Sequence, residues 1–512
     1  MRLIHTHLTL PEDLENQQER EDVYNGLDCA ITAEILDVLL PQLDDHTATT
    51  YAFSRALQGP VLEMQLRGIL VDQARRQDVI DEYYDVIDRL EGQLEQIVLD
   101  GVGMPSFSWR SNADLQKLFY GHLGIPTIRK QGRPTCDHKA LEKMQLFLVA
   151  RPIVNHLLTM REIQKKIDFL KTGVDPDGRI RTSYNISGTN TGRFSSSYSE
   201  FGTGGNLQNV EESLRSVFIS DWGWKFAKFD AKAGESYCVG AIEGNLFNDW
   251  RYLDAVESGD VHTAVARICW PQLPWTGNLR ADKAIAERPF YRHYSYRFMC
   301  KKLGHGSNYG GQPETLAMQT NLPEPVVIGF QPKYFRAFPA HLRWHGWTED
   351  QLRRLGYLIT LTGRKRWFFG RRNDPSTLRE AIAYNPQGSL ADIVNRAMLR
   401  IWRLRPCFIM MQDHDALTFM YKEEDEDVII PQLQEMLVEE IPLKHGRTLS
   451  IPYDCKVGWN KGDYCCGDRS NVGCKDCKRE INLDGLRDYE AHDERRRQPK
   501  VSIMDRLLHR KH

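Results

Sequence analysis

Residues 408–421 have the sequence FIMMQDHDALTFMY, in which an Asp-His-Asp triplet at 413–415 separates two apolar runs. Burying charge without a partner is costly, so an apolar core alone does not account for the triplet. The pattern predicts strands on both sides of a short polar segment. A second strand-like run, WKFAKFDA at 224–231, contains Asp230, which lies 185 residues (415 − 230) before Asp415. A small sheet with two strand-end acids is therefore the first constraint on the fold.

Two strand-end carboxylates that lie side by side repel each other unless a divalent cation lies between them. Oxygen ligands suit Mg²⁺, which takes further oxygens from water and from the phosphates of a substrate. Two such ions, about 4 Å apart, can activate an attacking hydroxyl and stabilise a leaving oxygen. An isolated Asp at a strand end is, however, more commonly a turn residue or a helix cap.

The chain has 512 residues, more than one hydrophobic core usually organises, so we expect two to four subdomains. Apolar periodicity predicts long helices over 79–99 and 151–170. A Gly/Ser/Thr/Asn-rich stretch at 188–209 predicts a long functional loop. Further strands are predicted within 357–369. This mixture of helices and a small sheet indicates an α+β fold.

Overall charge does not indicate a nucleic-acid partner, because the net charge is only −2. Two segments, 291–302 and 363–372, nevertheless interleave Arg and Lys with aromatic residues. Such segments suit phosphate neutralisation and base stacking, and they equally suit a solvated surface. The sequence shows neither a secretion signal nor an apolar run long enough for a membrane helix, so we expect a cytoplasmic protein without a membrane partner.

Arg297, Lys301, His305 and Tyr309 follow one another at a strict four-residue step. On a helix this step places all four side chains along one face. Such a face can bind a triphosphate and present rings to a base, although a solvated charged face would also explain the Arg and Lys. Two glycines at 310–311 predict the end of this helix.

At this point the sequence resembles DNA polymerase family A, the group of bacterial DNA polymerase I and many bacteriophage replicative enzymes. The resembling segments, in chain order, are LQGPVLEMQLRGILVD (57–72), RPTCDHKALEKM (133–144), TGRFSSS…NLQN (191–209), FDAKAGESY (229–237), SGDVHTAVA (258–266), the Arg297–Gly310 helix, ITLTGRKRW (359–367), AYNPQGSLADI (383–393) and QDHDA (412–416). These nine segments follow one another in the family's order and together extend over most of the chain, from residue 57 to residue 416.

The resemblance implies a role for each matching residue. Asp230 and Asp415 would hold two Mg²⁺ ions, with Mn²⁺ as a substitute. The dNTP-binding residues would be Glu235, as a steric gate against a 2′-hydroxyl, with His262, Arg297, Lys301, His305 and Tyr309. The primer–template residues would be Arg193, Asn206, Gln208, Arg364, Asn385, Gln387 and His414.

The implied architecture is a right-hand polymerase fold with palm, fingers and thumb. Its parts would be an exonuclease-edge remnant or linker helix (1–50), a thumb region (51–187), a first palm segment (188–250), fingers (251–355), a second palm segment (356–464) and a cysteine-containing basic tail (465–512). The implied activity is template-directed addition of dNTPs to a primer 3′-hydroxyl, a nucleotidyltransferase reaction of DNA replication. A phage-encoded enzyme would act in the bacterial host cytoplasm.

The sequence departs from the family pattern at several positions. His305 replaces a Phe or Tyr, Ala416 replaces the Glu that usually follows the second acid, and Asp413 stands where an apolar residue is usual. Ala231, Ala233 and Tyr237 also differ, and the spacing of Asn385 and Gln387 is one residue short. Neither metal-binding Asp is lost, so we expect activity, but Asp413 has no role that the sequence explains.

The two ends allow weaker interpretations. Tyr24 and Asp28 resemble the last motif of a 3′–5′ exonuclease. Asp13 and Glu15 have the spacing of the acids of its first motif, but too few residues precede Tyr24 to form the sheet that would hold those acids. We therefore expect no proofreading in this chain, with a separate exonuclease subunit as a candidate partner. In the tail, Cys465, Cys466, Cys474 and Cys477 fit a Zn²⁺ site or a group of free thiols. The basic end, 495–512, suits docking on DNA, a clamp or a helicase, or is a frayed terminus.

Two other functions remain open from the sequence. A single-subunit RNA polymerase shares the acids and the Arg/Lys/Tyr helix, but Glu235 argues against it because that family needs room for a 2′-hydroxyl. A catalytically silent scaffold with the polymerase fold could bind DNA or a partner. The retention of both acids, Arg297 and Lys301 argues against that alternative.

Overall fold

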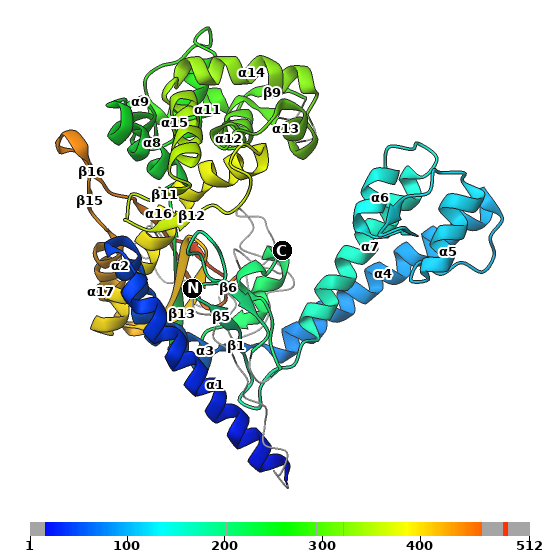
Figure 1. Cartoon of the computed structure of the whole chain (residues 1–512). Helices are drawn as coiled ribbons and strands as arrows, with labels where there is room; N and C mark the ends of the chain where they lie inside the picture. Colours follow the sequence, from blue (N-terminus) through cyan, green and yellow to red (C-terminus); the bar gives the residue numbers. More distant parts are fainter. Residues whose placement is uncertain (1–15, 200–201, 293, 321, 463–484, 490–512) are drawn as a thin grey trace. The chain divides into compact units, whose positions relative to one another are not determined.

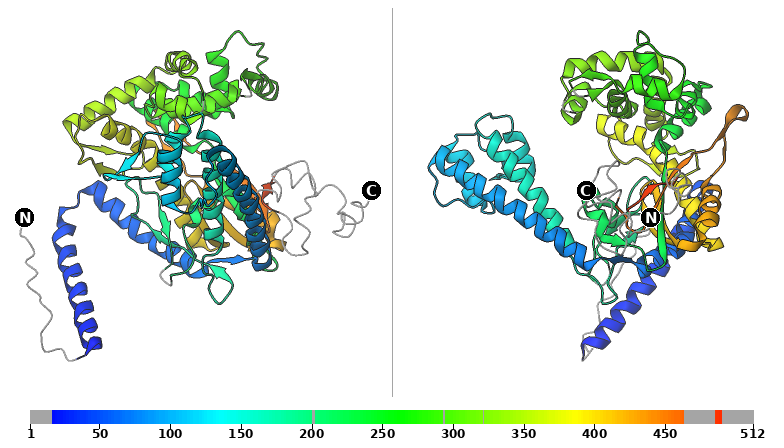
Figure 2. Two further views of the ribbon diagram at one scale, coloured as in Figure 1. Left: turned by 90° about the vertical axis from the view of Figure 1, so that its right-hand side faces the viewer. Right: turned by 180° about the vertical axis from the view of Figure 1, so that it is seen from behind.

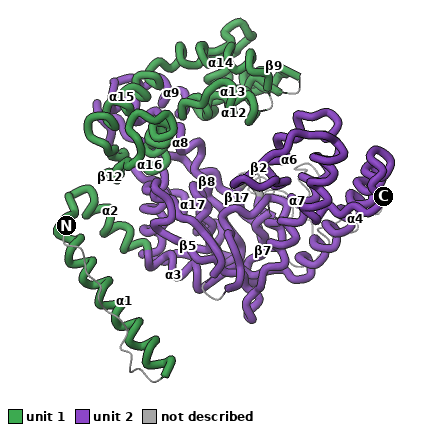
Figure 3. Tube along the Cα trace, turned by 45° about the vertical axis from the view of Figure 1, so that its right-hand side comes forward, with its two compact units in different colours: residues 1–57, 258–389 green, residues 58–257, 390–512 purple. Residues whose placement is uncertain are grey.

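The computed structural model describes residues 16–199, 202–292, 294–320, 322–462 and 485–489. The four tail cysteines, the basic end and the Asp13/Glu15 pair lie outside these residues. Two compact units, each built from two chain segments, make up the protein: 1–57 with 258–389, and 58–257 with 390–512 (Figure 3). Both contain helices and strands, so the α+β fold expected from the sequence is confirmed.

The second unit contains the central sheet. Its five strands are antiparallel and lie in the order β13-β14-β8-β17-β18. The elements around this sheet are β7 (Phe218–Ile219), β8 (Trp224–Ala231), α8 (Gly234–Phe247), α9 (Arg251–Glu257), β13 (Phe408–Asp413), β14 (Ala416–Lys422), α17 (Glu426–Leu437), β15 (Ile441–Pro442), β16 (Thr448–Leu449), β17 (Tyr453–Gly458) and β18 (Arg487–Asp488). The strand predicted at 224–231 corresponds residue for residue to β8.

The strand register places three aspartates, one on each of three strands, in one row across the sheet. Asp230 on β8 is opposite Ala416 on one neighbouring strand and Asp454 on the other. Asp413 on β13 is in turn opposite Ala416. Because directly opposite residues point to the same face, these four positions share one face of the sheet. The alternate positions, such as Phe229 and Phe419, are buried, and their rings pack edge to face at 5.9 Å.

Two long helices of the same unit, α4 (Gln73–Val102) and α7 (Arg151–Leu170), lie alongside each other as an arm (Figures 1 and 2). Figure 1 shows α5 (Asn112–Gln116) and α6 (His138–Met144) at the far end of this arm. The apolar positions of α4 recur about every seven residues and are buried against α7. This explains why periodicity alone predicted both helices.

The remaining elements of this unit lie at the base of the arm or in short hairpins. They are α3 (Gln58–Arg67), β1 (Ile69–Val71), β2 (Arg129–Lys130), β3 (Arg133–Pro134), β4 (Arg179–Ile180), β5 (Ser183–Asn185) and β6 (Ser195–Ser197). A small sheet in the order β4-β1-β7 closes the base. The segment 188–209, predicted as an irregular loop, contains β6, because its serines pair with β5.

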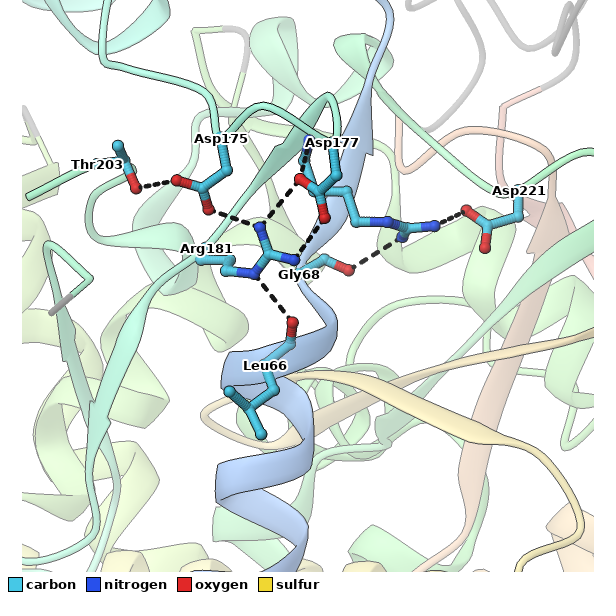
Figure 4. Close-up of polar contacts among 8 residues, drawn as sticks. Leu66, Gly68, Asp175, Asp177, Arg181, Thr203 and Asp221 are labelled. Carbon is cyan, nitrogen blue, oxygen red and sulfur yellow. Dashed lines mark hydrogen bonds and ion pairs between the residues drawn. The ribbon is translucent and has the colours of Figure 1, made fainter. Parts of the chain in front are cut away.

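An arginine network ties this loop to the base of the arm (Figure 4). Arg181 pairs with Asp175 at 2.6 Å and with Asp177 at 2.6 Å, and its Nε donates to the Leu66 carbonyl at 2.9 Å. The hydroxyl of Thr203 donates to Asp175 at 2.7 Å. Gly204, at φ +72°, lies so close that a Cβ there would be 1.7 Å from the Arg181 carbonyl oxygen. The loop position therefore depends on Arg181.

The first unit is mainly helical. Its elements are α1 (Gln17–Leu39), α2 (Asp45–Ala56), α10 (Val261–Cys269), α11 (Leu279–Ala286), β9 (Pro289–Tyr291), β10 (Tyr294–Ser295), α12 (Tyr296–Asn308), α13 (Pro313–Thr320), α14 (Glu324–Ala337), α15 (Ala340–Arg354), β11 (Tyr357–Ile359), β12 (Lys365–Trp367) and the first half of α16 (Pro375–Leu404). The apolar face of α12 packs against α10 and α14. Ser295 caps the start of α12, since its side chain accepts from the Phe298 N–H at 3.1 Å.

Two findings concern expectations about the whole chain. Among the described residues, no helix is both long and apolar enough to cross a membrane. Five of the seven described cysteines are buried, as expected for small core residues.

Candidate active site

The Asp-His-Asp segment forms the turn between β13 and β14. His414 has φ +61°, a conformation that an ordinary side chain adopts only where the surroundings hold it. The Asp415 carbonyl accepts from the Ala231 N–H at 3.0 Å, which ties the turn to the end of β8. Gln412 donates to the His414 carbonyl at 2.9 Å, and Gln208 donates to the Gln412 carbonyl at 3.0 Å. The turn is thus supported on both sides.

Asp230 and Asp415, separated by 185 residues in sequence (415 − 230), lie close enough for their charges to interact. Burial raises the pKa of the Asp230 carboxyl, and the charge of Asp415 raises it further. Lys228, whose Nζ is 3.6 Å from Asp230 Oδ2, opposes this shift. Burial likewise raises the pKa of Asp415, while Arg193 lowers it. Two partly buried carboxylates whose ionised forms are disfavoured are a suitable environment for a cation.

The donor set tests whether a metal would fit. Carboxylate oxygens suit Mg²⁺ or Mn²⁺. Among the described residues, no group of three or more His, Cys, Asp and Glu could hold a metal ion. Asp230 and Asp415 thus offer carboxylate oxygens, and an ion held by them would take its remaining oxygens from water or substrate.

Two further expected site residues are paired with each other. Arg193 forms an ion pair with Glu235, which lies in the first turn of α8. Both side chains are partly buried. The charge of Arg193 also reaches the turn, because it adds to the effect of burial in lowering the pKa of His414. The charge of Arg193 thus acts on both His414 and Asp415.

Several expected primer–template residues are engaged within the protein. Gln208 is buried, and its amide bonds to Gln412. Asn385 is also buried, and its amide donates to the Ile359 carbonyl at 3.4 Å. Asn206 accepts from the Ser196 hydroxyl at 2.6 Å, and His414 lies 3.3 Å from the Asn209 side chain. Gln208 and Asn385 thus bond to main-chain carbonyls, whereas Asn206 and His414 contact other side chains.

Arg364 and Gln387 are the other two residues expected to follow the primer–template. Arg364 lies just before β12, and its N–H donates to the Thr360 hydroxyl at 3.0 Å. Gln387 lies on α16, one residue after a proline inside that helix, and its side chain is partly buried.

The first unit contains five of the expected nucleotide-binding residues. Burial lowers the pKa of His262 to about 4, and the charges of Arg297, Lys301 and His305 contribute to the lowering. Arg297, Lys301 and His305 lie on α12, and Tyr309 follows its last residue. The rings of His305 and Tyr309 meet edge to face at 5.1 Å. The predicted helix and its end at the two glycines are confirmed.

Sequence reasoning missed Asp260. Its side chain caps α10, accepting from the His262 N–H at 3.2 Å and from the Thr263 hydroxyl at 2.8 Å. It also binds Arg297 Nε at 2.8 Å, so it holds the guanidinium in place. The Asp just before an apolar run was a recognisable cap signal, but its link to Arg297 requires the fold.

These features define an α+β fold of the right-hand polymerase type. The polymerase domain of Pol1 from M. smegmatis, solved with DNA primer-template and dNTP, has a similar fold, with a TM-score of 0.62 and 24% identity over 79% of this chain and 69% of that one. The sequence model of the family "DNA polymerase family A" matches residues 77–464 of this chain. The chain belongs to this family.

Curated relatives agree with the family assignment. The thermostable DNA polymerase I of Thermus filiformis is 26% identical over 476 residues, which are 88% of this chain and 52% of the relative. The DNA polymerase I of Chloroflexus aurantiacus is 27% identical over 466 residues, which are 85% of this chain and 45% of the relative. The chain thus spans about half the length of the curated relatives it matches.

Proposed function

We propose that this protein is a DNA-directed DNA polymerase that adds dNTPs to a primer 3′-hydroxyl in DNA replication. The observation that supports this most is the pair Asp230 and Asp415. They come from two strand ends far apart in sequence, share a partly buried environment and have raised pKa values. Membership of DNA polymerase family A also supports this activity.

Asp230 and Asp415 would hold two Mg²⁺ ions, with Mn²⁺ as a substitute. Such ions, when bound, supply charge stabilisation to a transferring phosphoryl group. Arg297 and Lys301 bind the triphosphate, because a guanidinium already oriented by Asp260 loses little entropy when phosphate oxygens approach. His262 stays neutral at physiological pH and donates or accepts hydrogen bonds there.

Glu235 excludes ribonucleotides in this proposal. Its carboxylate is held by Arg193, so it cannot swing freely to admit a 2′-hydroxyl. Tyr309 and His305 present their rings to the incoming base or sugar. Arg193, Arg364, Gln387 and His414 contact the primer–template, and the buried Gln208 and Asn385 hold the backbone that makes those contacts.

The proposal extends to the parts of the chain and their context. We assign the thumb to 51–187, the palm to 188–250 and 356–464, and the fingers to 251–355. We assign 1–50 to an exonuclease-edge remnant or a linker segment, and 465–512 to a cysteine-containing basic tail. The setting would be replication in a bacterial cytoplasm, for a phage or its host, with proofreading supplied by a separate subunit and with a clamp or helicase as a further partner.

Primer extension with dNTPs or rNTPs, comparing the wild type with Asp415→Ala, tests the function. We expect templated extension with dNTPs and Mg²⁺, little extension with rNTPs, and a loss of at least about a thousandfold in the variant. Unchanged extension by the variant contradicts the assignment of the acids. Equal use of rNTPs contradicts the role of Glu235 and favours an RNA polymerase.

A further inference from the structure

A buried lysine lies beneath the turn between β13 and β14. Lys461, in the segment after β17, has only 4% of its surface exposed. Its Nζ is 2.9 Å from Asp413 Oδ2 and 2.8 Å from the Met411 sulfur. The side chain of Asp413 is 14% exposed. The acid that departs from the family pattern therefore has a specific partner.

The segment around Lys461 is attached to the base of the arm. The Lys461 N–H donates to the Phe218 carbonyl on β7 at 2.8 Å, and the Ser220 N–H donates to the Trp459 carbonyl at 2.9 Å. Because β7 belongs to the base sheet β4-β1-β7, the ion pair joins the turn to that sheet.

Stability alone does not explain a pair of this kind. Two charges lose most of their hydration when buried, and replacing such a pair by uncharged side chains of similar volume is often neutral or stabilising. The pair instead restricts geometry, because the Asp413 carboxylate can reach the buried Lys461 ammonium in only a few side-chain orientations. Asp413 is followed by His414, at φ +61°, and then by Asp415. An anchor at Asp413 thus limits the orientations of the whole turn.

We propose that Asp413 and Lys461 are positioning residues, which orient the β13–β14 turn so that the Asp415 carboxylate faces Asp230. This inference rests on the proposed polymerase function for its kinetic consequence. Its structural part concerns the turn alone. Their role in this proposal is to hold the turn, without contact to the reacting atoms.

The test uses the double variant Asp413→Asn/Lys461→Met, which removes both charges and nearly keeps both shapes. The matched control is Lys225→Met/Glu426→Gln. Lys225, near the opposite end of β8 from Asp230, and Glu426, the first residue of α17, form a second buried pair, 2.9 Å apart with side chains 5% and 1% exposed. Both double variants lose a buried ion pair, and the control also loses the contact of Lys225 with the half-exposed Glu423. Only the first variant loses the anchor of the turn.

Single-turnover nucleotide addition and primer–template affinity are measured for the three proteins. We expect the Asp413/Lys461 variant to add nucleotides about tenfold or more slowly, since small misplacements of reacting groups cost up to about a hundredfold. Its Kd for primer–template should remain within about twofold. The control should match the wild type in both. A normal rate in the first variant, or an equal loss in the control, overturns the proposal.

Hydrogen exchange separates this inference from the polymerase assignment. The peptide covering 408–422 should exchange faster in the Asp413/Lys461 variant than in the wild type, and unchanged exchange overturns the proposal whatever the activity. If the wild type adds no nucleotide while the turn loosens as expected, the polymerase function fails and the positioning of the turn stands.

Discussion

Removing the Arg181 guanidinium should be among the most destabilising single changes at the base of the arm (Figure 4). The change is Arg181→Met, which keeps most of the side-chain volume. Arg181 is 14% exposed, and its partner Asp175 only 10%. Asp177 is 47% exposed, and the Leu66 carbonyl also loses its donor.

The size of the effect follows from the exposure of each partner. Breaking a buried ion pair typically costs about 3–5 kcal/mol of unfolding free energy. Asp175 keeps its hydrogen bond from the Thr203 hydroxyl, so we take the lower end, about 3 kcal/mol, for the broken Arg181–Asp175 pair. The Leu66 carbonyl adds about 1 kcal/mol. Asp177 returns to water at a cost below about 1 kcal/mol. We therefore expect a loss of about 4 kcal/mol.

Urea unfolding followed by intrinsic fluorescence measures this loss, and Arg447→Met is the matched control. Arg447 also binds two carboxylates, Asp254 at 2.7 Å and Glu257 at 2.6 Å, but these are 60% and 36% exposed. The control should lose no more than about 1 kcal/mol. An Arg181 variant as stable as the Arg447 variant refutes the reasoning from burial.

Three other perturbations have defined outcomes. Asp415→Asn should abolish extension yet raise the midpoint of urea unfolding in EDTA. The reason is that the pKa values of Asp230 and Asp415 are raised in the folded protein, so their ionised forms destabilise the metal-free fold at neutral pH. A lower midpoint contradicts this. Because the pKa of His262 is lowered to about 4, the unfolded chain binds its proton first, so stability is lost as pH falls from 6.5 towards 4. His262→Asn should remove that part of the loss in thermal melts between these pH values, and parallel pH profiles would argue against it. Gly204→Ala should cost about 1–3 kcal/mol more than Gly202→Ala in urea unfolding. Both glycines have positive φ, but only Gly204 lacks room for a Cβ, so equal losses contradict the clash.

Much of the framework could be predicted from local pattern. The helix at 151–170 and the strand at 224–231 correspond to α7 and β8, because each periodic apolar face is buried along its own element. The four-residue step of Arg297, Lys301 and His305 also needs only helical geometry. The hairpin around Asp415 followed from two apolar runs and a polar break.

The partners of the polar residues could not be predicted in this way. Lys461 lies in a polar segment, NKGDY, yet its side chain is buried against Asp413 and Met411. Gln208 was expected to face DNA, but its amide bonds to Gln412 across 204 residues of sequence. Asp260 was recognisable as a cap and not as the partner of Arg297.

The difference has a physical reason. Apolar burial is non-directional and depends on which face a residue occupies. Periodicity in the amino-acid sequence therefore predicted the long helices, the strands next to Asp230 and Asp415, and the place of these two acids at strand ends. An ion pair or hydrogen bond acts over about 3 Å and needs a particular partner, which the path of the whole chain selects. Tertiary structure therefore determined that Asp413, the outlier in the turn, binds Lys461, and that the base of the arm is linked to the turn that contains Asp415.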